Sequence, residues 1–284
     1  MARAKANGIE IAYDLLGSGE PLLLIGGFGM TREFWGTLPA SLADRFQVIV
    51  YDNRGSGEST LPSEPFSIAD MAEDAIGLMD ALEIRTAHIF GVSMGGMIGQ
   101  LLCAGHPGRV RKAILGCTGH GGRHAIPTPP LAMKTFEELA NPDLLPEAAA
   151  RLLIPILFSE KFVSSETERV EAYIKVSVEH PQTRKGARFQ MGALMEFDAE
   201  SLLGKVNTQV LVVTGSEDIL IPPENSKLLA GKLPNARLEV IGGAGHNFFF
   251  ETPETVLELV GEFLAGNPVD GTMPEPQHIS PQTS

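Results

Sequence analysis

The chain has 284 residues, too many for a mini-domain and few for two large domains, so we expect one core with one sizeable insertion. Its net charge is −13, from 22 basic and 35 acidic residues, which argues against nucleic acid as a partner, because nucleic-acid binding needs a basic face. Two cysteines, Cys103 and Cys117, are too few for a disulfide framework or a thiolate metal cluster. No segment reaches the roughly 18 apolar residues of a membrane span, and the first residues lack the apolar segment of a secretory signal. We therefore expect an acidic, cytoplasmic globular protein without a membrane partner.

Short apolar runs alternate along the chain with longer segments of helical periodicity. The short runs are almost continuously apolar, as strands are when both faces of their sheet are buried, and they cover residues 21–25, 47–51, 88–90, 112–115, 209–213 and 238–241. The periodic segments predict helices over residues 68–82, 93–103, 222–233 and 253–265. This alternation predicts an α/β fold with a mostly parallel, doubly wound sheet flanked by helices.

Capping signals and prolines suggest where several helices begin or end. Ser67 with Asp70, and Ser165 with Glu168, have the spacing of a capping box, so a helix is expected to begin at each serine. Pro155 is expected to interrupt another helix, because proline lacks the backbone N–H that a helix interior needs.

One long segment departs from the alternation. For about 90 residues after Cys117 no strand is predicted, whereas a crossover between parallel strands needs only about a dozen residues. We expect residues 118–207 to form a helical cap over the carboxyl edge of the sheet, inserted into a core of residues 1–117 and 208–266. The alternative is that this segment simply continues the core. Residues 267–284 hold four prolines and few large apolar side chains, which predicts a disordered tail.

The strongest chemical signal is the sequence Gly-Val-Ser-Met-Gly at residues 91–95, directly after one predicted strand and before a predicted helix. This is the G-x-S-x-G pattern of a nucleophile elbow. The serine of such a turn has strained backbone angles, and the flanking glycines relieve the crowding. Ser93 would then present its hydroxyl above the sheet edge, at a helix N-terminus that favours developing negative charge. The alternative reading is a glycine turn that occurs by chance.

A nucleophilic serine needs a base, and the base needs an orienting carboxylate. Glu217 and Asp218 follow the strand predicted at 209–213, and His246 follows the strand predicted at 238–241. Both positions should lie at the carboxyl edge of the sheet, where open α/β sheets bind ligands. The chain returns to this edge after every crossover, so residues far apart in the sequence can share one site.

With these residues the chain resembles the α/β-hydrolase fold superfamily, and in particular its capped serine esterases and lactonases. The resemblance covers roughly residues 8–266 apart from the insertion, and its motifs lie at residues 52–59, 91–96, 215–222 and 245–246. It implies that Ser93 is the nucleophile, His246 the base and Asp218 the acid. Glu217 is the rival acid, but the family places the acid three residues after the glycine and four before the proline, which selects Asp218.

The resemblance also implies an oxyanion hole made of the backbone N–H groups of Phe28 and Met94. Family members usually read His-Gly-x-Gly in this loop, whereas here the histidine position is Gly26. The change removes a side chain that steadies the loop, so a more mobile oxyanion loop is expected. It removes no donor, because the donors belong to the backbone.

Other candidate residues carry weaker signals. His120 and His124 have the spacing of a helical metal site, but the surrounding glycines argue against a helix, so we expect neither a metal nor a cofactor. Met191 and Met195 lie in the insertion and are candidates for an adaptable apolar substrate pocket, or else they only hold the insertion together.

The resemblance implies a serine hydrolase that cleaves a small-molecule carboxylic ester or lactone through an acyl-enzyme on Ser93. The same machinery admits C–C hydrolysis of vinylogous diketones, enol-lactone hydrolysis and perhydrolysis. The serine argues against the dehalogenases and epoxide hydrolases of this fold, which use an aspartate at the elbow. A receptor that binds its ligand without turnover is the hypothesis from another class. The sequence favours no particular acyl or alcohol group of the substrate and no particular oligomeric state.

Overall fold

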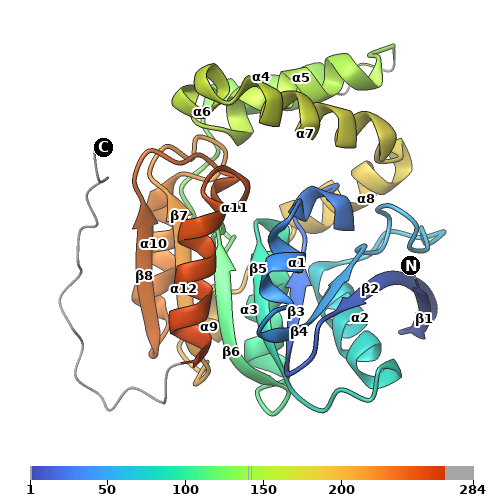
Figure 1. Ribbon diagram of the computed structural model, residues 1–284, viewed down its shortest axis with the longest axis vertical. Helices are drawn as coiled ribbons and strands as arrows, with labels where there is room; N and C mark the ends of the chain where they lie inside the picture. Colours follow the sequence, from blue (N-terminus) through green and yellow to red (C-terminus); the bar gives the residue numbers. More distant parts are fainter. Residues whose placement is uncertain (1, 140, 142, 266–284) are drawn as a thin grey trace.

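A computed structural model describes residues 2–139, 141 and 143–265, so the tail predicted at 267–284 lies outside the described residues. Eight strands form one sheet in the order β1-β2-β4-β3-β5-β6-β7-β8 (Figure 1). The strands are β1 Ala2–Ala6, β2 Ile9–Leu16, β3 Glu20–Ile25, β4 Phe46–Tyr51, β5 Ala87–Val92, β6 Val110–Gly116, β7 Gln209–Gly215 and β8 Ala236–Ile241. Strands β3 to β8 run parallel, which confirms the predicted mostly parallel sheet.

The antiparallel edge of the sheet was not predicted. Strand β1 pairs with β2, and β2 pairs with β4, both antiparallel. Asn7 and Gly8 join β1 to β2, and both have positive φ, 45° and 78°, as a two-residue hairpin turn requires. An Asn-Gly pair is itself a hairpin signal, but β2 is only half buried and lacks the continuous apolar run that marks the other strands.

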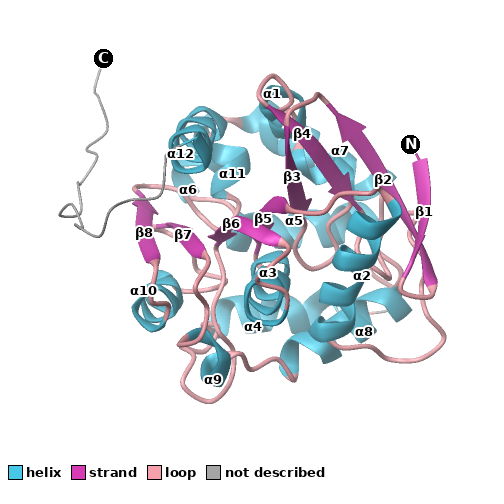
Figure 2. Cartoon of the chain, turned by 90° about the horizontal axis from the view of Figure 1, so that it is seen from below, coloured by secondary structure: helices cyan, strands magenta, loops and turns pink. Residues whose placement is uncertain are grey.

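Helices cover both faces of the sheet (Figure 2). One face carries α2 Ile68–Ala81, α3 Met94–Gly105 and α10 Pro223–Lys232, and the other carries α1 Leu38–Leu42, α11 Phe248–Glu251 and α12 Pro253–Ala265. A short 3-10 helix, η1, spans Arg32–Trp35. Successive strand residues point to opposite faces, so Leu23 packs in the cluster under α2 and α3 while Leu22 and Leu24 pack toward α1 and α12. In the part of the chain that the structure describes, no helix combines the length and apolar character needed to cross a membrane.

The segment between β6 and β7 is helical. It contains α4 Pro130–Leu139, α5 Pro146–Leu157, α6 Glu160–Ser165, α7 Thr167–Glu179, α8 Arg184–Met195 and α9 Glu200–Leu203. Helices α4 to α7 lie above the ends of the strands (Figure 1), and α5 to α7 share an apolar cluster that includes Phe158 and Tyr173. Helix α9 instead contacts α3 and α10, so the end of the segment has returned to the helices that cover the sheet. We call residues 118–207 the insertion.

Three local expectations can be compared directly with the helices. The capping box at the start of α2 is confirmed, because the Asp70 N–H donates to the Ser67 hydroxyl and the Ser67 N–H donates to the Asp70 carboxylate. The capping box at Ser165 is wrong: Ser165 is the last residue of α6, and its hydroxyl donates to the Lys161 carbonyl. The expected break at Pro155 is also wrong, because α5 continues through Pro155 to Leu157.

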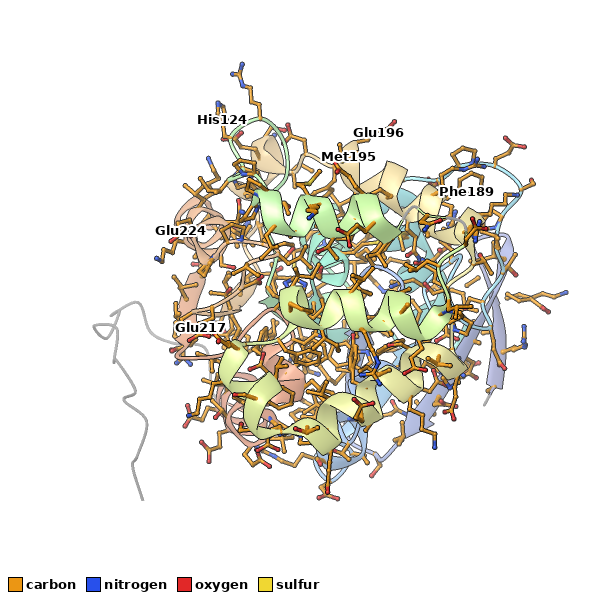
Figure 3. All side chains as sticks on the ribbon, turned by 90° about the horizontal axis from the view of Figure 1, so that it is seen from above. His124, Phe189, Met195, Glu196, Glu217 and Glu224 are labelled. Atoms are coloured by element: carbon orange, nitrogen blue, oxygen red, sulfur yellow. The ribbon has the colours of Figure 1, made fainter. Side chains whose placement is uncertain are left out.

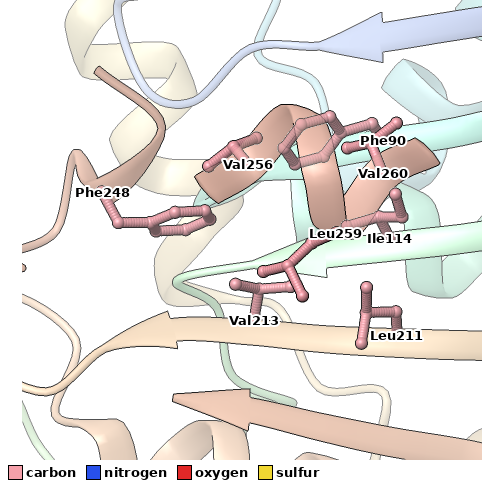
Figure 4. Close-up of a pocket in the computed structure, with 8 residues that line it drawn as sticks. All are labelled: Phe90, Ile114, Leu211, Val213, Phe248, Val256, Leu259 and Val260. Atoms are coloured by element: carbon pink, nitrogen blue, oxygen red, sulfur yellow. The ribbon is translucent and has the colours of Figure 1, made fainter. Parts of the chain in front are cut away.

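A small cavity lies between the sheet and α12 (Figure 4). Its walls are apolar side chains from three strands and two helices: Phe90, Ile114, Leu211, Val213, Phe248, Val256, Leu259 and Val260. No polar group is available there to orient a ligand, so this cavity is a gap in core packing and not a candidate functional site.

Candidate active site

Ser93 stands on the tight turn between β5 and α3. Its φ of 55° and ψ of −119° lie in a region that side chains rarely adopt, and its N–H donates to the Gly116 carbonyl at 2.8 Å. A Cβ on Gly91 would lie 2.1 Å from the Gly95 carbonyl oxygen, and a Cβ on Gly95 would lie 2.0 Å from the Ile25 carbonyl oxygen. The two glycines are therefore required for the turn to form.

The loop after β3 lies directly against this turn. A Cβ on Gly27 would come within 3.1 Å of the Ser93 Cβ. Among the residues that the structure describes, neither the Phe28 N–H nor the Met94 N–H donates to an acceptor. Met94 is also the first residue of α3, where backbone N–H groups have no partner within the helix. Two backbone donors beside Ser93 are thus available to a substrate oxygen.

Other groups hold this loop in place of the absent histidine. The Met30 sulfur accepts the Gly27 N–H at 3.0 Å, and the Met30 N–H donates to the Gly27 carbonyl at 3.2 Å. The Asn53 side-chain amide donates to the Gly26 carbonyl at 2.9 Å. A Cβ on Gly26 would lie only 3.1 Å from the Met30 Cβ, so Met30 fills the space beside Gly26. These contacts restrain the loop that was expected to be more mobile. The sequence analysis did not predict them.

Asp218 and His246 form a buried pair at the same edge of the sheet. The His246 Nδ1 lies 2.8 Å from the Asp218 Oδ2, and each residue is only 3% exposed. The other carboxylate oxygen, Oδ1, accepts the N–H groups of Leu220 at 2.9 Å and Ile221 at 2.8 Å, which fixes its orientation. Glu217 is exposed, at the outside of the molecule (Figure 3). The geometry thus pairs the histidine with Asp218 and leaves Glu217 in solvent.

The surroundings of His246 shift its protonation in a definite direction. Burial acts to lower the pKa of His246, but the charge and hydrogen bond of Asp218, with a further contribution from the Cys117 side chain, raise this pKa well above its ordinary value of 6.5. Cys117 is fully buried and directly follows Gly116, whose carbonyl holds the Ser93 N–H. Gly116 also borders the segment after His246, because a Cβ on Gly116 would lie 2.9 Å from the ring of Phe248.

The insertion holds the histidine loop, residues 245–247. The Glu251 carboxylate accepts the Gly245 N–H at 2.9 Å, the Ser159 N–H at 3.0 Å and the Ser159 hydroxyl at 2.7 Å. The Asn247 N–H donates to the Leu157 carbonyl at 2.8 Å. Since Ser159 caps α6 and Leu157 ends α5, the position of His246 is tied to that of the insertion.

The weaker candidate residues differ in how far they are buried. Met195 ends α8 and is 79% exposed (Figure 3), which does not fit a pocket wall, because its side chain points to solvent. Met191, one helical turn earlier, is half buried. The His120 ring is fully buried, whereas His124 is exposed and pairs with Glu200 at 2.6 Å. Within the described residues, no group of three or more histidine, cysteine or acidic side chains could hold a metal ion.

Two residues that contact the site were missed by the sequence analysis. Glu251 has no distinguishing pattern, because its partner Ser159 lies 92 residues away. Gln190 on α8 is fully buried and bonds the loop after β3. Its only sequence signal is a polar residue on the same face of α8 as the small residues Gly186 and Ala193.

Comparisons with known proteins show the family to which the chain belongs. The model of the alpha/beta hydrolase fold family matches residues 20–253. RutD of Caulobacter segnis, proposed to be a carbamate hydrolase, is 32% identical over 249 residues, which cover 87% of this chain and 92% of RutD. The enol-lactonase of Burkholderia xenovorans LB400 superposes with a TM-score of 0.83 at 26% identity, covering 93% of this chain and 100% of the enol-lactonase. A thermophilic esterase of Thermogutta terrifontis superposes with a TM-score of 0.80 at 29% identity, covering 93% and 98%. The chain belongs to the α/β hydrolase family.

Proposed function

We propose that the chain is a serine hydrolase that cleaves a small-molecule carboxylic ester or lactone. The observation that carries this proposal is the meeting of two features at the end of β6. Ser93, on its strained turn, donates its N–H to Gly116, and a Cβ on Gly116 would lie 2.9 Å from the ring of Phe248, two residues after the His246 of the buried Asp218–His246 pair. A hydroxyl on a sharp turn, a base and an orienting carboxylate are the parts that nucleophilic acyl transfer requires.

In the proposed reaction the Ser93 hydroxyl attacks the substrate carbonyl while the His246 Nε2 takes its proton. Asp218 keeps the Nδ1 of the imidazole protonated and stabilises the imidazolium that forms. His246 then protonates the leaving alcohol, and the acyl group stays on Ser93. A water molecule, deprotonated by His246, attacks this acyl-enzyme and releases the carboxylic acid.

The negative oxygen of the tetrahedral intermediate would be bound by the backbone N–H groups of Phe28 and Met94. Neither group donates to another acceptor in the described part of the chain; Met94 directly follows Ser93, and Phe28 directly follows Gly27, which packs against Ser93. Donors of this kind act without rearranging during the reaction, and the loss of one typically costs about 10²- to 10³-fold in kcat.

The relatives suggest which carbonyl compounds to compare. An enol-lactonase and an esterase are among the similar structures, and RutD is proposed to act on a carbamate. In each of these substrate classes a carbonyl carbon accepts the nucleophile and a heteroatom leaves. A panel of aryl and alkyl esters, a lactone, an enol-lactone, a carbamate and a vinylogous diketone, compared by kcat/KM, would select among them.

The test of the proposal is turnover together with labelling. With p-nitrophenyl acetate we expect more than one product per protein molecule, and with a serine-directed phosphonate we expect one adduct, located on Ser93 by peptide mapping. Ser93→Ala should abolish both while the protein stays folded. An adduct on a different serine would refute the assigned nucleophile. Stoichiometric binding without turnover across the whole panel would favour a receptor.

A further inference from the structure

Gln190, in the middle of α8, uses its buried side-chain amide to join three parts of the chain. Its Oε1 accepts the Gly29 N–H at 3.0 Å and the Gln182 side-chain N–H at 2.7 Å. Its Nε2 donates to the Arg54 carbonyl and to the Ser56 hydroxyl, both at 2.9 Å. Protein groups therefore fill every hydrogen-bonding position of the amide. The residue is also 0% exposed.

These partners fix the orientation of the amide. If it were flipped, its NH₂ group would face the Gly29 N–H and its oxygen would face the Arg54 carbonyl, so donors would oppose donors and acceptors would oppose acceptors. The backbone of α8 also approaches the core closely, because a Cβ on Gly186 would lie 2.2 Å from the Gly55 carbonyl oxygen. Gln190 is therefore held firmly enough to serve as a fixed acceptor for Gly29.

The bond to Gly29 reaches the peptide next to the Phe28 donor. In the loop after β3, the Gly27 N–H is held by the Met30 sulfur and the Gly29 N–H by Gln190, whereas the Phe28 N–H between them has no acceptor in the described chain. Restraining the peptides on both sides fixes the direction in which the Phe28 N–H points. Met30 belongs to the loop itself, but Gln190 belongs to the insertion.

We infer that Gln190 is a positioning residue that aims the Phe28 N–H at the reacting oxygen, so that oxyanion stabilisation in this protein depends on the insertion. This inference rests on the proposed function for its kinetic consequence. The hydrogen bond to Gly29 would do the work that a histidine in the loop does in proteins that read His-Gly-x-Gly. The insertion would then contribute to the chemical step as well as to substrate choice.

The central experiment replaces Gln190 by leucine, which has a similar size and no acceptor for the Gly29 N–H. We expect kcat for an activated ester to fall about 10- to 100-fold with KM changed less than about twofold, because a displaced donor weakens binding of the transition state more than that of the substrate. Gln190→Glu keeps an acceptor for the Gly29 N–H and should recover part of kcat. Lys185→Leu, at an exposed position of the same helix, is the matched control and should behave as the wild type does.

A second readout does not depend on turnover. Amide hydrogen exchange in the peptide spanning residues 26–30 should accelerate in Gln190→Leu and stay slow in Gln190→Glu and Lys185→Leu. A lower melting temperature with wild-type kcat and wild-type exchange would mean that Gln190 only docks α8, and would overturn the inference. If Gln190→Leu does not fold, a folded Gln190→Glu with fast exchange at residues 26–30, or with a loss of kcat as large as that expected for Gln190→Leu, would overturn the inference. If the wild type hydrolyses no ester, the proposed function fails, whereas the exchange measurement still decides whether Gln190 holds the loop.

Discussion

At the scale of single residues, the hydrogen bond between Asp218 and His246 predicts that activity requires the carboxylate of Asp218 and not that of the adjacent Glu217. Asp218→Asn should lower kcat on the order of 10⁴-fold, because an amide cannot hold the required imidazole tautomer or balance the imidazolium charge. Glu217→Gln, one residue away and exposed, should change kcat little. Steady-state kinetics of the two variants on one ester check this. The reverse order of effects would show that the wrong carboxylate has been assigned.

The raised pKa of His246 predicts how activity depends on pH. As a base the imidazole must be neutral, and since its pKa lies well above 6.5, kcat/KM should rise with pH through an apparent pKa above that value. Asp218→Asn removes the charge that favours the imidazolium, so any residual activity should titrate at lower pH. A pH profile of kcat/KM for both proteins, with an ester whose alcohol does not titrate, measures the shift. An unchanged midpoint in Asp218→Asn would contradict the assigned cause.

At the scale of elements, α8 offers a test of substrate choice with an internal control. Met191 is half buried and Met195 is exposed on the same helix. If Met191 lines the substrate pocket, Met191→Ala should change kcat/KM ratios between short and long acyl esters, by about 10- to 200-fold for contacts of methylene size. Met195→Ala should leave the ratios alone. A lowered melting temperature in Met191→Ala with unchanged ratios would leave Met191 with a packing role only.

Elements were predictable where local physics decides them. Strands β3 to β7 follow apolar runs because both faces of the sheet are covered, and α2 begins at Ser67 because its cap is complete within four residues. Strand β2 was missed because it is only half buried and lacks a continuous apolar run, although it pairs with both β1 and β4. The start of α7 was misplaced because Ser165 ends the preceding helix and bonds backward to Lys161.

At the scale of the whole molecule, hydrogen bonds attach the insertion to the loops on both sides of Ser93. Glu251 and Ser159 join it to the histidine loop, and Gln190 joins it to the loop after β3. Glu251→Ala would leave the buried N–H groups of Ser159 and Gly245 without their acceptor and should cost about 3 kcal/mol of unfolding free energy. Glu258→Ala, at an exposed position of α12, should stay within about 0.5 kcal/mol of the wild type. Urea denaturation of the two variants checks the difference, and equal stabilities would contradict it.

Some residues of the candidate site could be predicted from the sequence, whereas the residues that hold them in place could not. Ser93, Asp218 and His246 each follow a strand and sit in a short motif, so their positions at one sheet edge follow from the fold. The partners that hold them have no such marks. Gln190 lies 161 residues from Gly29, and Glu251 lies 92 from Ser159, so only the folded chain brings them together.

The backbone of Ser93 has a consequence for how mutation acts on this protein. A φ of 55° on a residue with a side chain costs of order 1–3 kcal/mol, and glycine adopts that angle without this penalty. The free energy of unfolding of Ser93→Gly should therefore exceed that of Ser93→Ala by about 1 kcal/mol, although both variants lack the Ser93 hydroxyl. Ser93→Gly should accordingly unfold at a higher denaturant concentration. Equal stabilities would show that the turn is unstrained. Selection for stability alone would favour glycine here, so a serine at this angle is what the proposed nucleophilic role predicts.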